Sequence, residues 1–175
     1  MLESPAKHPS RAVPARGGPV NLLAGQIHFT TRPTVIKTLL GSCVAVVLWH
    51  PTRHIGGMCH FLLPNRRRPP GAAPDARYGD EALELLVTAV NRHGTSPREY
   101  ETHLYGGADT MPDRTGVKSN IGERNIEQGC VLIDQYGFDL QAVDVGDYVP
   151  RTVTLDMIGG HIEVRRGPPA GRKAP

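Results

Sequence analysis

The sequence predicts a layered α/β (α+β) sandwich with mostly antiparallel or mixed sheets and two main helices. Short apolar runs rich in β-branched residues recur between Gly and Pro turns, which is typical of strands. Only two segments, residues 79–93 and 122–136, carry apolar side chains at helical spacing. A chain of 175 residues has the length of a single layered domain.

The strand-like runs, in chain order, are residues 26–31, 35–40, 43–49, 55–63, 100–105, 140–145, 151–156 and 161–166. The first of them, Gln26 to Thr31, alternates in the manner of an edge strand. Residues 41–42 separate the second run from the third, and a turn at residues 50–53 is expected to make a hairpin of the third and fourth. This hairpin would place Cys43 and His60 on neighbouring strands.

The two predicted helices have recognisable ends. Gly94 follows the first helix and suits the position after its last turn. The second helix is expected to start near Ser119 or Asn120 and to end before Gly137. Gly129 should weaken it by about 1 kcal/mol relative to alanine. Its core-facing side is expected to use three residues at helical spacing: Ile126, Cys130 and Ile133.

The two ends of the chain differ from its middle. Residues 1–18 are rich in Pro, Ala, Arg and Gly and show no apolar periodicity, so we expect a disordered segment. Residues 167–175 are expected to form a flexible tail. Residues 19–166 are therefore predicted to form a single catalytic domain.

Composition argues against several functional classes. The net charge is only +3, and no basic run is interleaved with aromatic residues, so nothing indicates nucleic-acid binding. No apolar run approaches the roughly 20 residues that cross a membrane, and the start does not resemble a signal peptide. The three cysteines form no CxxC pair and no even set, which predicts free thiols in the cytoplasm.

Cys43 and His60 are the most informative candidate site. Cys43 follows a glycine-serine turn and opens an apolar run, and His60 lies in the next run. An imidazole can take the proton of a thiol, and the resulting thiolate attacks carbonyl carbon. Gly41 has no side chain, so substrate is expected to approach the backbone closely there, and the backbone N–H groups around Ser42 and Cys43 are expected to point at a developing oxyanion. The pattern predicts a cysteine hydrolase that acts on a carbonyl group.

Two other interpretations use the same residues. Cysteine often fills an apolar core, and Cys59 and Cys130 fit that role. A metal site would have to use His50, His54, Cys59 and His60, which are close in sequence. Adjacent strand residues point to opposite faces, however, and the short ligand pairs of structural zinc sites are absent. No metal and no organic cofactor is predicted.

Residues 38–43 (TLLGSC) and 56–64 (GGMCHFLLP) resemble the chemoreceptor glutamine deamidase family, CheD. The resemblance continues at residues 77–80, 104–108, 121–125 and 144–146 and at Arg151, and it covers about residues 20–166. The sequence departs from the family pattern in three places: His103 stands where lysine is frequent, Asp147 stands where a second glycine is common, and Gly129-Cys130 interrupts a usually stronger helix.

The resemblance implies a fold similar to the catalytic domain of cytotoxic necrotizing factor toxins. It implies hydrolysis of glutamine side chains to glutamate on methyl-accepting chemotaxis receptors, which are then the protein substrate. Cys43 aligns with the family nucleophile and His60 with its base, and Thr38 is the nearest match to a third catalytic element, a threonine. The mechanism expected from these groups passes through a thioester on Cys43.

Other roles remain open at the level of sequence. Gly41, Ser42, Gly106 and Gly107 are candidate substrate-binding residues, although tight turns explain the glycines equally well. Residues 66–68, all arginine, are either a dock for acidic neighbours of the substrate glutamine or a solvated loop. The chain is alternatively a non-enzymatic module that binds a CheC-type phosphatase, a partner that the resemblance implies in some organisms, or a receptor glutamyl methylesterase.

Overall fold

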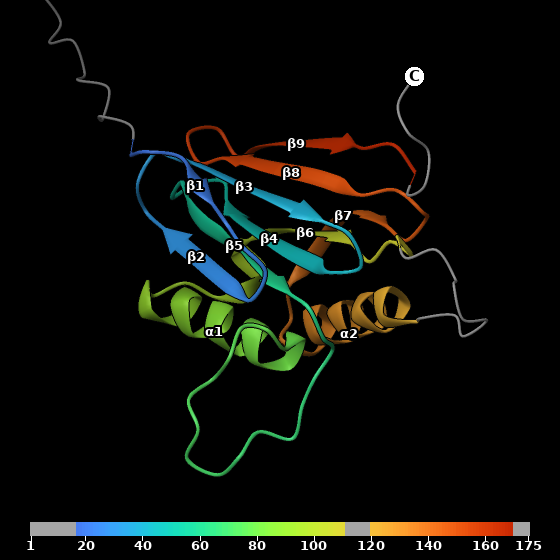
Figure 1. Ribbon diagram of the computed structural model, residues 1–175. Helices are drawn as coiled ribbons and strands as arrows, with labels where there is room; N and C mark the ends of the chain where they lie inside the picture. The colour runs from blue at the N-terminus through green and yellow to red at the C-terminus, as the bar shows by residue number, and fades with distance from the viewer. Residues whose placement is uncertain (1–16, 111–119, 170–175) are drawn as a thin grey trace, which may run out of the picture.

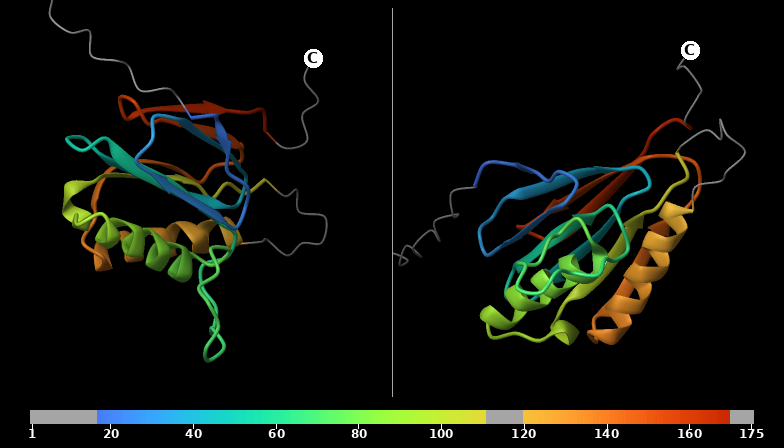
Figure 2. Two further views of the ribbon diagram at one scale, coloured as in Figure 1. Left: turned by 90° about the vertical axis from the view of Figure 1, so that its left-hand side faces the viewer. Right: turned by 60° about the horizontal axis from the view of Figure 1, so that its bottom comes forward.

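The computed structural model describes residues 17–110 and 120–169. These residues form three layers: a four-stranded sheet, a five-stranded sheet packed against it, and two helices on the outer face of the five-stranded sheet (Figure 1). Figure 2 shows from two further directions that both helices lie on the same side of the sandwich. The predicted layered α/β sandwich with mixed sheets and two helices is confirmed.

The strands and helices follow the predicted order closely. The two-residue strand β1 and the 3₁₀ turn η1 are additions that the sequence did not predict, and β5 ends two residues earlier than expected. The elements of the described residues are β1 (Val20–Asn21), β2 (Gln26–Thr30), β3 (Val35–Leu40), β4 (Val44–His50), β5 (Ile55–Phe61), α1 (Gly79–Arg92), η1 (Pro97–Glu99), β6 (Glu101–Gly106), α2 (Ile121–Gln135), β7 (Asp139–Val145), β8 (Arg151–Asp156) and β9 (His161–Arg166).

The strand order places β3 and β4 in different sheets. One sheet has the order β1-β3-β8-β9 and the other β2-β5-β4-β6-β7, so the chain changes sheets at residues 41–43. β4 and β5 form the predicted hairpin, with Ala45 opposite His60 and Val44 opposite Phe61. β2 is an edge strand, as predicted. The change of sheet brings the end of β3 next to the start of β4.

The core has two apolar clusters, one on each side of the five-stranded sheet. Leu40, Val47 and Met58 belong to the cluster between the sheets, and Cys59 and Phe61 belong to the cluster under the helices. Side chains alternate along a strand, so His60 faces the space between the sheets together with Met58. β4 and β5 are buried along their whole length because both faces of these central strands are covered.

The second helix buries a different face from the predicted one. Cys130 is exposed, and Gly129 takes the buried position beside it. A Cβ atom on Gly129 would lie 2.9 Å from Leu104 Cδ1, so the missing side chain lets the helix approach the sheet. Ile133 is buried and Ile126 packs against the core, as predicted. The prediction that Cys130 faces the core was wrong. The helix backbone lies so close to the sheet on this face that Gly129 takes the buried position, and Cys130 beside it is exposed.

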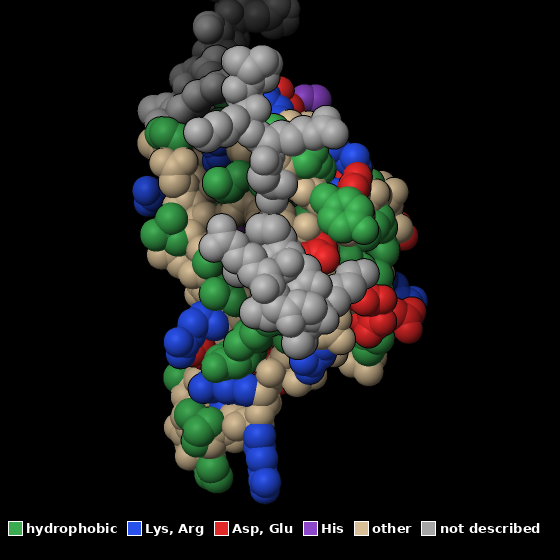
Figure 3. All heavy atoms as spheres, turned by 45° about the vertical axis from the view of Figure 1, so that its right-hand side comes forward, with side chains coloured by type: hydrophobic (Ala, Val, Ile, Leu, Met, Phe, Trp, Pro, Cys, Tyr) green, Lys and Arg blue, Asp and Glu red, His purple; other side chains and the backbone are tan. Residues whose placement is uncertain are grey.

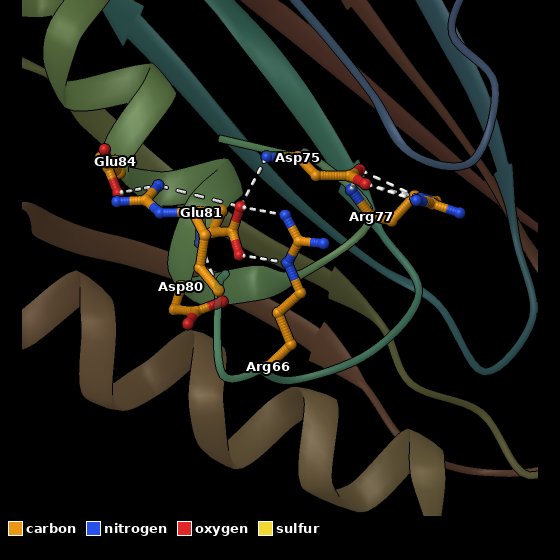
Figure 4. A network of polar contacts seen from close by, with 7 residues as sticks. Arg66, Asp75, Arg77, Asp80, Glu81 and Glu84 are labelled. Carbon is orange, nitrogen blue, oxygen red and sulfur yellow. Dashed lines mark hydrogen bonds and ion pairs between the residues drawn. The ribbon is translucent and has the colours of Figure 1, made fainter. Parts of the chain in front are cut away.

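The loop between β5 and α1 is fastened to the helix by a buried carboxylate. Glu81 is 2% exposed and accepts hydrogen bonds from Arg66 Nε at 2.7 Å, from Arg66 Nη2 at 3.1 Å and from the Asp75 N–H at 2.7 Å (Figure 4). The hydrogen bond from Arg66 is the main cause that lowers the pKa of Glu81. Arg68 pairs with Glu84 at 3.0 Å. Two of the three arginines at residues 66–68 are therefore engaged within the protein.

Parts of the two terminal segments and one internal stretch of the chain lie outside the described residues. This applies to residues 1–16, 111–119 and 170–175, and so to most of the two terminal segments and to Ser119. Of the N-terminal segment, the Gly17 N–H donates to Pro33 O at 2.8 Å, and Thr34 Oγ1 donates to Gly18 O at 2.7 Å. Within the described parts of the chain, no helix has both the length and the apolar character needed to span a bilayer.

Candidate active site

His60 and Thr38 meet between the two sheets. His60 is on β5 of the five-stranded sheet, and Thr38 is on β3 of the four-stranded sheet. Thr38 Oγ1 lies 2.7 Å from His60 Nδ1 and donates a hydrogen bond to Leu22 O at 2.7 Å. Both side chains are buried, at 3% and 4% exposure. The change of sheet after β3 makes this contact possible.

The hydrogen bonds around Thr38 fix the protonation of the His60 ring. A hydroxyl group has one proton to donate, and the Leu22 carbonyl can only accept it. Thr38 Oγ1 must therefore accept the second hydrogen bond, which His60 Nδ1–H donates. The proton of the neutral imidazole is thus on Nδ1, and Nε2 carries a lone pair. A lone pair on Nε2 is what a general base requires.

Burial keeps the His60 ring neutral. It lowers the pKa of His60 from 6.5 to about 4, because charge is poorly solvated between the sheets. Nε2 is buried and has no hydrogen-bond partner among the described residues. At neutral pH this nitrogen is therefore unprotonated.

Cys43 lies on the same face of the sheet as His60. Its half-buried side chain packs against the cluster between the sheets, with Ala45 and Val47. Cys43 directly precedes the last pair of the β4–β5 ladder, Val44 and Phe61. If the register continued by one residue, Cys43 and His60 would be diagonal neighbours, which are typically about 7–8 Å apart at the Cα atoms. No hydrogen bond joins the thiol and the imidazole among the described residues. The structure brings the predicted pair to one face of the sheet without a hydrogen bond between them.

The thiol of Cys43 is protonated in this arrangement. Desolvation by burial raises its pKa, and the N–H group of Cys43 itself offsets this only in part. A raised pKa of the thiol and a lowered pKa of the imidazole both favour the neutral pair over a thiolate and an imidazolium ion. Proton transfer therefore has to accompany the reaction with the substrate.

The residues that follow β6 hold the turn that carries Cys43. The Gly107 N–H donates to Cys43 O at 2.8 Å, and the Ala108 N–H donates to Gly41 O at 2.9 Å. Gly106 has φ +107°, and a Cβ atom there would overlap the Cys43 carbonyl oxygen. Gly107 has φ +68°, and a Cβ atom there would overlap Ile126. Close approach and positive φ thus account for both glycines, and their predicted contact with substrate stays a prediction.

The N–H groups of the nucleophile turn are available to an oxyanion. Among the described residues, the N–H groups of Ser42 and Cys43 donate no backbone hydrogen bond. A Cβ atom on Gly41 would lie 3.1 Å from Thr110 Oγ1, so a larger residue there would require the Thr110 side chain to shift. Two N–H donors next to a nucleophile can stabilise the negative charge of a tetrahedral intermediate.

A cavity of about 470 Å³ reaches Thr38 and His60 from the protein surface. It opens beside β3, and its walls include Leu23 and Leu39, which are 64% and 65% exposed. Lys37 supplies the one charged side chain of its lining. Cys43 is not among the lining residues of this cavity. A larger, shallow hollow of about 700 Å³ lies between β2 and the loop before α1 and includes neither Cys43 nor His60.

The residues considered for a metal site are not gathered around one point. Cys59 packs under the helices, whereas His60 faces the space between the sheets. His50 lies at the far end of β4, where its Nε2 is 3.4 Å from Glu99 Oε1. The described residues contain no group of three or more His, Cys, Asp or Glu side chains that could hold a metal ion.

Sequence reasoning missed one group at the site and found a second only as a member of residues 121–125, which resemble the family and were candidates to line the cleft. The missed group is the carbonyl of Leu22, which no sequence pattern reveals because every residue has a carbonyl. The other is Asn125 on α2, which is fully buried and donates through Nδ2 to Ser42 O at 3.0 Å and to Leu62 O at 2.8 Å. The sequence signal for this role was an asparagine one turn into a helix, with a glycine before it and a glycine after it on the same face.

Comparison with known proteins gives a consistent family. Residues 62–166 match the family model described as CheD chemotactic sensory transduction. A protein of Pseudomonas fluorescens (strain SBW25), named a probable chemoreceptor glutamine deamidase CheD, is 44% identical over 151 residues, which is 85% of each chain. A protein of the same name from Pseudomonas syringae pv. tomato is 40% identical, and the match covers 84% of this chain and 88% of that protein. A protein of Dechloromonas aromatica, named a probable chemoreceptor glutamine deamidase CheD 3, is 42% identical, and the match covers 86% of this chain and 89% of that protein.

The family model begins just after His60, so the model match alone does not include the candidate pair. The alignment with the Pseudomonas fluorescens protein does include the pair. Because this alignment covers 85% of the chain, it spans both Cys43 and His60 whichever residue it starts from.

Proposed function

Because this chain belongs to the CheD family, we propose that it hydrolyses glutamine side chains of methyl-accepting chemotaxis receptors to glutamate, with Cys43 as nucleophile and His60 as base. The relatives carry the name chemoreceptor glutamine deamidase, which supplies the substrate class. The observation that carries the chemistry is the hydrogen-bond chain from Leu22 O through Thr38 to His60 Nδ1, which leaves Nε2 free to accept a proton.

In the first half of the reaction, His60 Nε2 takes the proton of the Cys43 thiol while the sulfur bonds to the carboxamide carbon. The carbonyl electrons move to oxygen, and the N–H groups of Ser42 and Cys43 stabilise the resulting oxyanion. The imidazolium then gives its proton to the amide nitrogen, the C–N bond breaks and ammonia leaves. A thioester between Cys43 and the glutamyl side chain remains.

In the second half, a water molecule attacks the thioester carbon and His60 Nε2 takes its proton. The C–S bond breaks, the sulfur receives the proton back, and glutamate is released. His60 acts as base and then as acid in both halves, which is typically worth about 10²–10⁴-fold in rate. The neutral resting pair suits this role, because the proton moves as each bond forms.

Thr38 contributes by orienting His60 rather than by contacting the reacting atoms. Its hydroxyl fixes the Nδ1–H tautomer, and its acceptor lone pair stabilises the imidazolium that forms on proton transfer. The family resemblance implied a third catalytic element at Thr38, and the orienting role is our assignment from this hydrogen bond.

Of residues 66–68, Arg67 is the exposed side chain without an ion pair among the described residues. Figure 3 shows Lys and Arg side chains gathered toward the lower end of the molecule, where Figure 1 places the loop between β5 and α1. We assign receptor docking to Arg67: Arg67→Glu should raise KM at low salt and leave kcat unchanged, and an unchanged KM would contradict the assignment.

Three further expectations belong to this proposal. The cytoplasm is the proposed location, supported by three free cysteines. A fold like that of the cytotoxic necrotizing factor catalytic domain stays a prediction from the family resemblance, and so does binding of a CheC-type phosphatase. A methylesterase activity on receptor glutamyl esters uses the same attack with an easier leaving group, so both substrates should be tested.

The test is ammonia release from a receptor cytoplasmic fragment. The wild-type protein should release ammonia, and Cys43→Ala should release none while keeping its fold by circular dichroism. Cys130→Ala is the matched control and should keep wild-type activity, because that side chain is exposed on α2 away from the site. Release of methanol from methylated fragments without release of ammonia would instead indicate the esterase.

A further inference from the structure

We infer that Asn125 is a positioning residue that sets the separation of Cys43 and His60. The inference rests on the proposed function, in which these two side chains must transfer a proton. Asn125 has no hydrogen bond to either side chain among the described residues. It acts on the two backbone segments from which they project, through one buried amide group.

The two hydrogen bonds of Asn125 lie where the β4–β5 ladder stops. The last paired residues are Val44 and Phe61. Immediately beyond them, Asn125 Nδ2 donates to Ser42 O on one side and to Leu62 O on the other. The amide therefore bridges the two chains at the point where backbone pairing ends and the nucleophile turn begins.

The bridged carbonyls are close to the reacting groups along the chain. Ser42 directly precedes Cys43, and Leu62 is two residues beyond His60. The distance between the two carbonyls is limited by the two hydrogen bonds of a single nitrogen, at 3.0 and 2.8 Å. Loss of that nitrogen frees the turn to move relative to β5, and with it the thiol relative to the imidazole.

The helix is built to bring this short side chain within reach. Gly122, Asn125 and Gly129 share the buried face of α2. A Cβ atom on Gly122 would overlap Gly107 O, and one on Gly129 would lie 2.9 Å from Leu104 Cδ1. The two glycines let the helix backbone approach β6 and its turn closely enough for an asparagine to bond both carbonyls.

The chemistry of the position requires an amide donor. Both partners are carbonyl oxygens, which only accept, and the Asn125 NH₂ group supplies two protons. An aspartate of the same shape would bring a buried carboxylate against two carbonyl oxygens. Asn125→Asp therefore keeps the volume and reverses the interaction, whereas Asn125→Ala removes it.

The experiment compares Asn125→Asp and Asn125→Ala with Thr95→Val, in receptor deamidation and in thiol labelling. Thr95 is a matched control because it is buried and bonds Val90 O and Tyr100 OH away from the site. Each protein is assayed at a temperature that lies the same number of degrees below its own thermal unfolding midpoint. Both Asn125 variants should lose at least about tenfold in kcat with KM within about twofold, since a 1 Å misplacement can cost about 10²-fold. Thr95→Val should keep wild-type kcat.

A double-mutant comparison separates positioning from general stability. If Asn125 acts by aligning the pair, Asn125→Ala should reduce kcat far less in a His60→Ala background than in the wild-type protein. Equal losses in the two backgrounds, or a loss in Thr95→Val as large as that in the Asn125 variants, would overturn the inference.

Labelling of Cys43 by iodoacetamide, located by peptide mass spectrometry, gives a readout that does not need the receptor. The pH profile of the labelling rate should depend on His60 in the wild-type protein, and this dependence should disappear in both Asn125 variants. Persistence of the wild-type profile in those variants would overturn the inference. If labelling of Cys43 follows these expectations in the wild-type protein and in both Asn125 variants, but no ammonia is released from receptors, the proposed function is refuted and the positioning role stays supported.

Discussion

Replacing Thr38 by valine removes the hydroxyl that orients His60 and keeps the shape of the side chain. Thr38 Oγ1 bonds both Leu22 O and His60 Nδ1 at 2.7 Å, in a site that is 3–4% exposed. Thr38→Val therefore leaves a buried carbonyl and a buried ring N–H without partners. An unsatisfied buried group costs about 1–3 kcal/mol, so the free energy of unfolding should fall by about 2 kcal/mol or more.

The catalytic effect of Thr38→Val should be larger than its effect on binding. Without the hydroxyl, the His60 ring is free to carry its proton on Nε2, where it cannot act as base. General base catalysis is worth about 10²–10⁴-fold, and we expect loss of about 10–10²-fold in kcat with KM nearly unchanged. Steady-state ammonia release from a receptor fragment measures both constants.

Thr38→Ser is the matched control for this prediction. It keeps the hydroxyl and deletes one methyl group, which costs about 1 kcal/mol of stability. Its kcat should stay within a few-fold of wild type, at temperatures equally far below the unfolding midpoints. A Thr38→Val protein with wild-type kcat, or a Thr38→Ser protein as slow as Thr38→Val, would refute the orienting role.

Three other predictions follow from the structure. The pKa of His60 is about 4 in the folded protein and 6.5 in the unfolded chain, so the unfolded state binds the extra proton between these pH values. The free energy of unfolding should thus fall by up to about 3 kcal/mol as the pH is lowered from 6.5 to 4. Urea titrations at several pH values should show a weaker pH dependence of this free energy in His60→Gln, and an equal pH dependence in the two proteins would contradict the claim. Gly106→Ala should destabilise the protein by about 3 kcal/mol or more, because the added Cβ atom overlaps Cys43 O. Gly137→Ala has open space at φ +75° and should cost about 1–2 kcal/mol. Equal losses of melting temperature in the two variants would show that the close approach of Gly106 to Cys43 O is unimportant. Glu81→Gln should make the loop before α1 sensitive to trypsin, because Arg66 and the Asp75 N–H lose a buried carboxylate partner; cleavage rates equal to wild type would exclude that anchoring role.

Most strands and both helices were predictable because local patterns decide them. The β-branched run at residues 35–40 and the hairpin around residues 50–54 follow from apolar periodicity and turn residues. The change of sheet at residues 41–43 was not predictable, because a glycine-serine turn looks the same whether the strands pair or separate. Only the packing of the two sheets decides it.

The candidate site was predictable to the extent that side-chain chemistry reveals it. Cys43 and His60 stand out as a thiol and an imidazole on neighbouring strands, and family resemblance pointed to Thr38. The contributions of Leu22 O and Asn125 depend on tertiary contacts that join distant parts of the chain. Gly129 was misjudged for a similar reason: helix propensity counts its cost, while the contact with Leu104 gives its benefit.

The most direct test is mass spectrometry of a receptor cytoplasmic fragment incubated with the protein in ¹⁸O-water. The wild-type protein should convert defined glutamines to glutamates that carry one oxygen from the solvent, and Cys43→Ala should convert none. Conversion of the same glutamines by Cys43→Ala would contradict the central claim that the sulfur of Cys43 is the nucleophile.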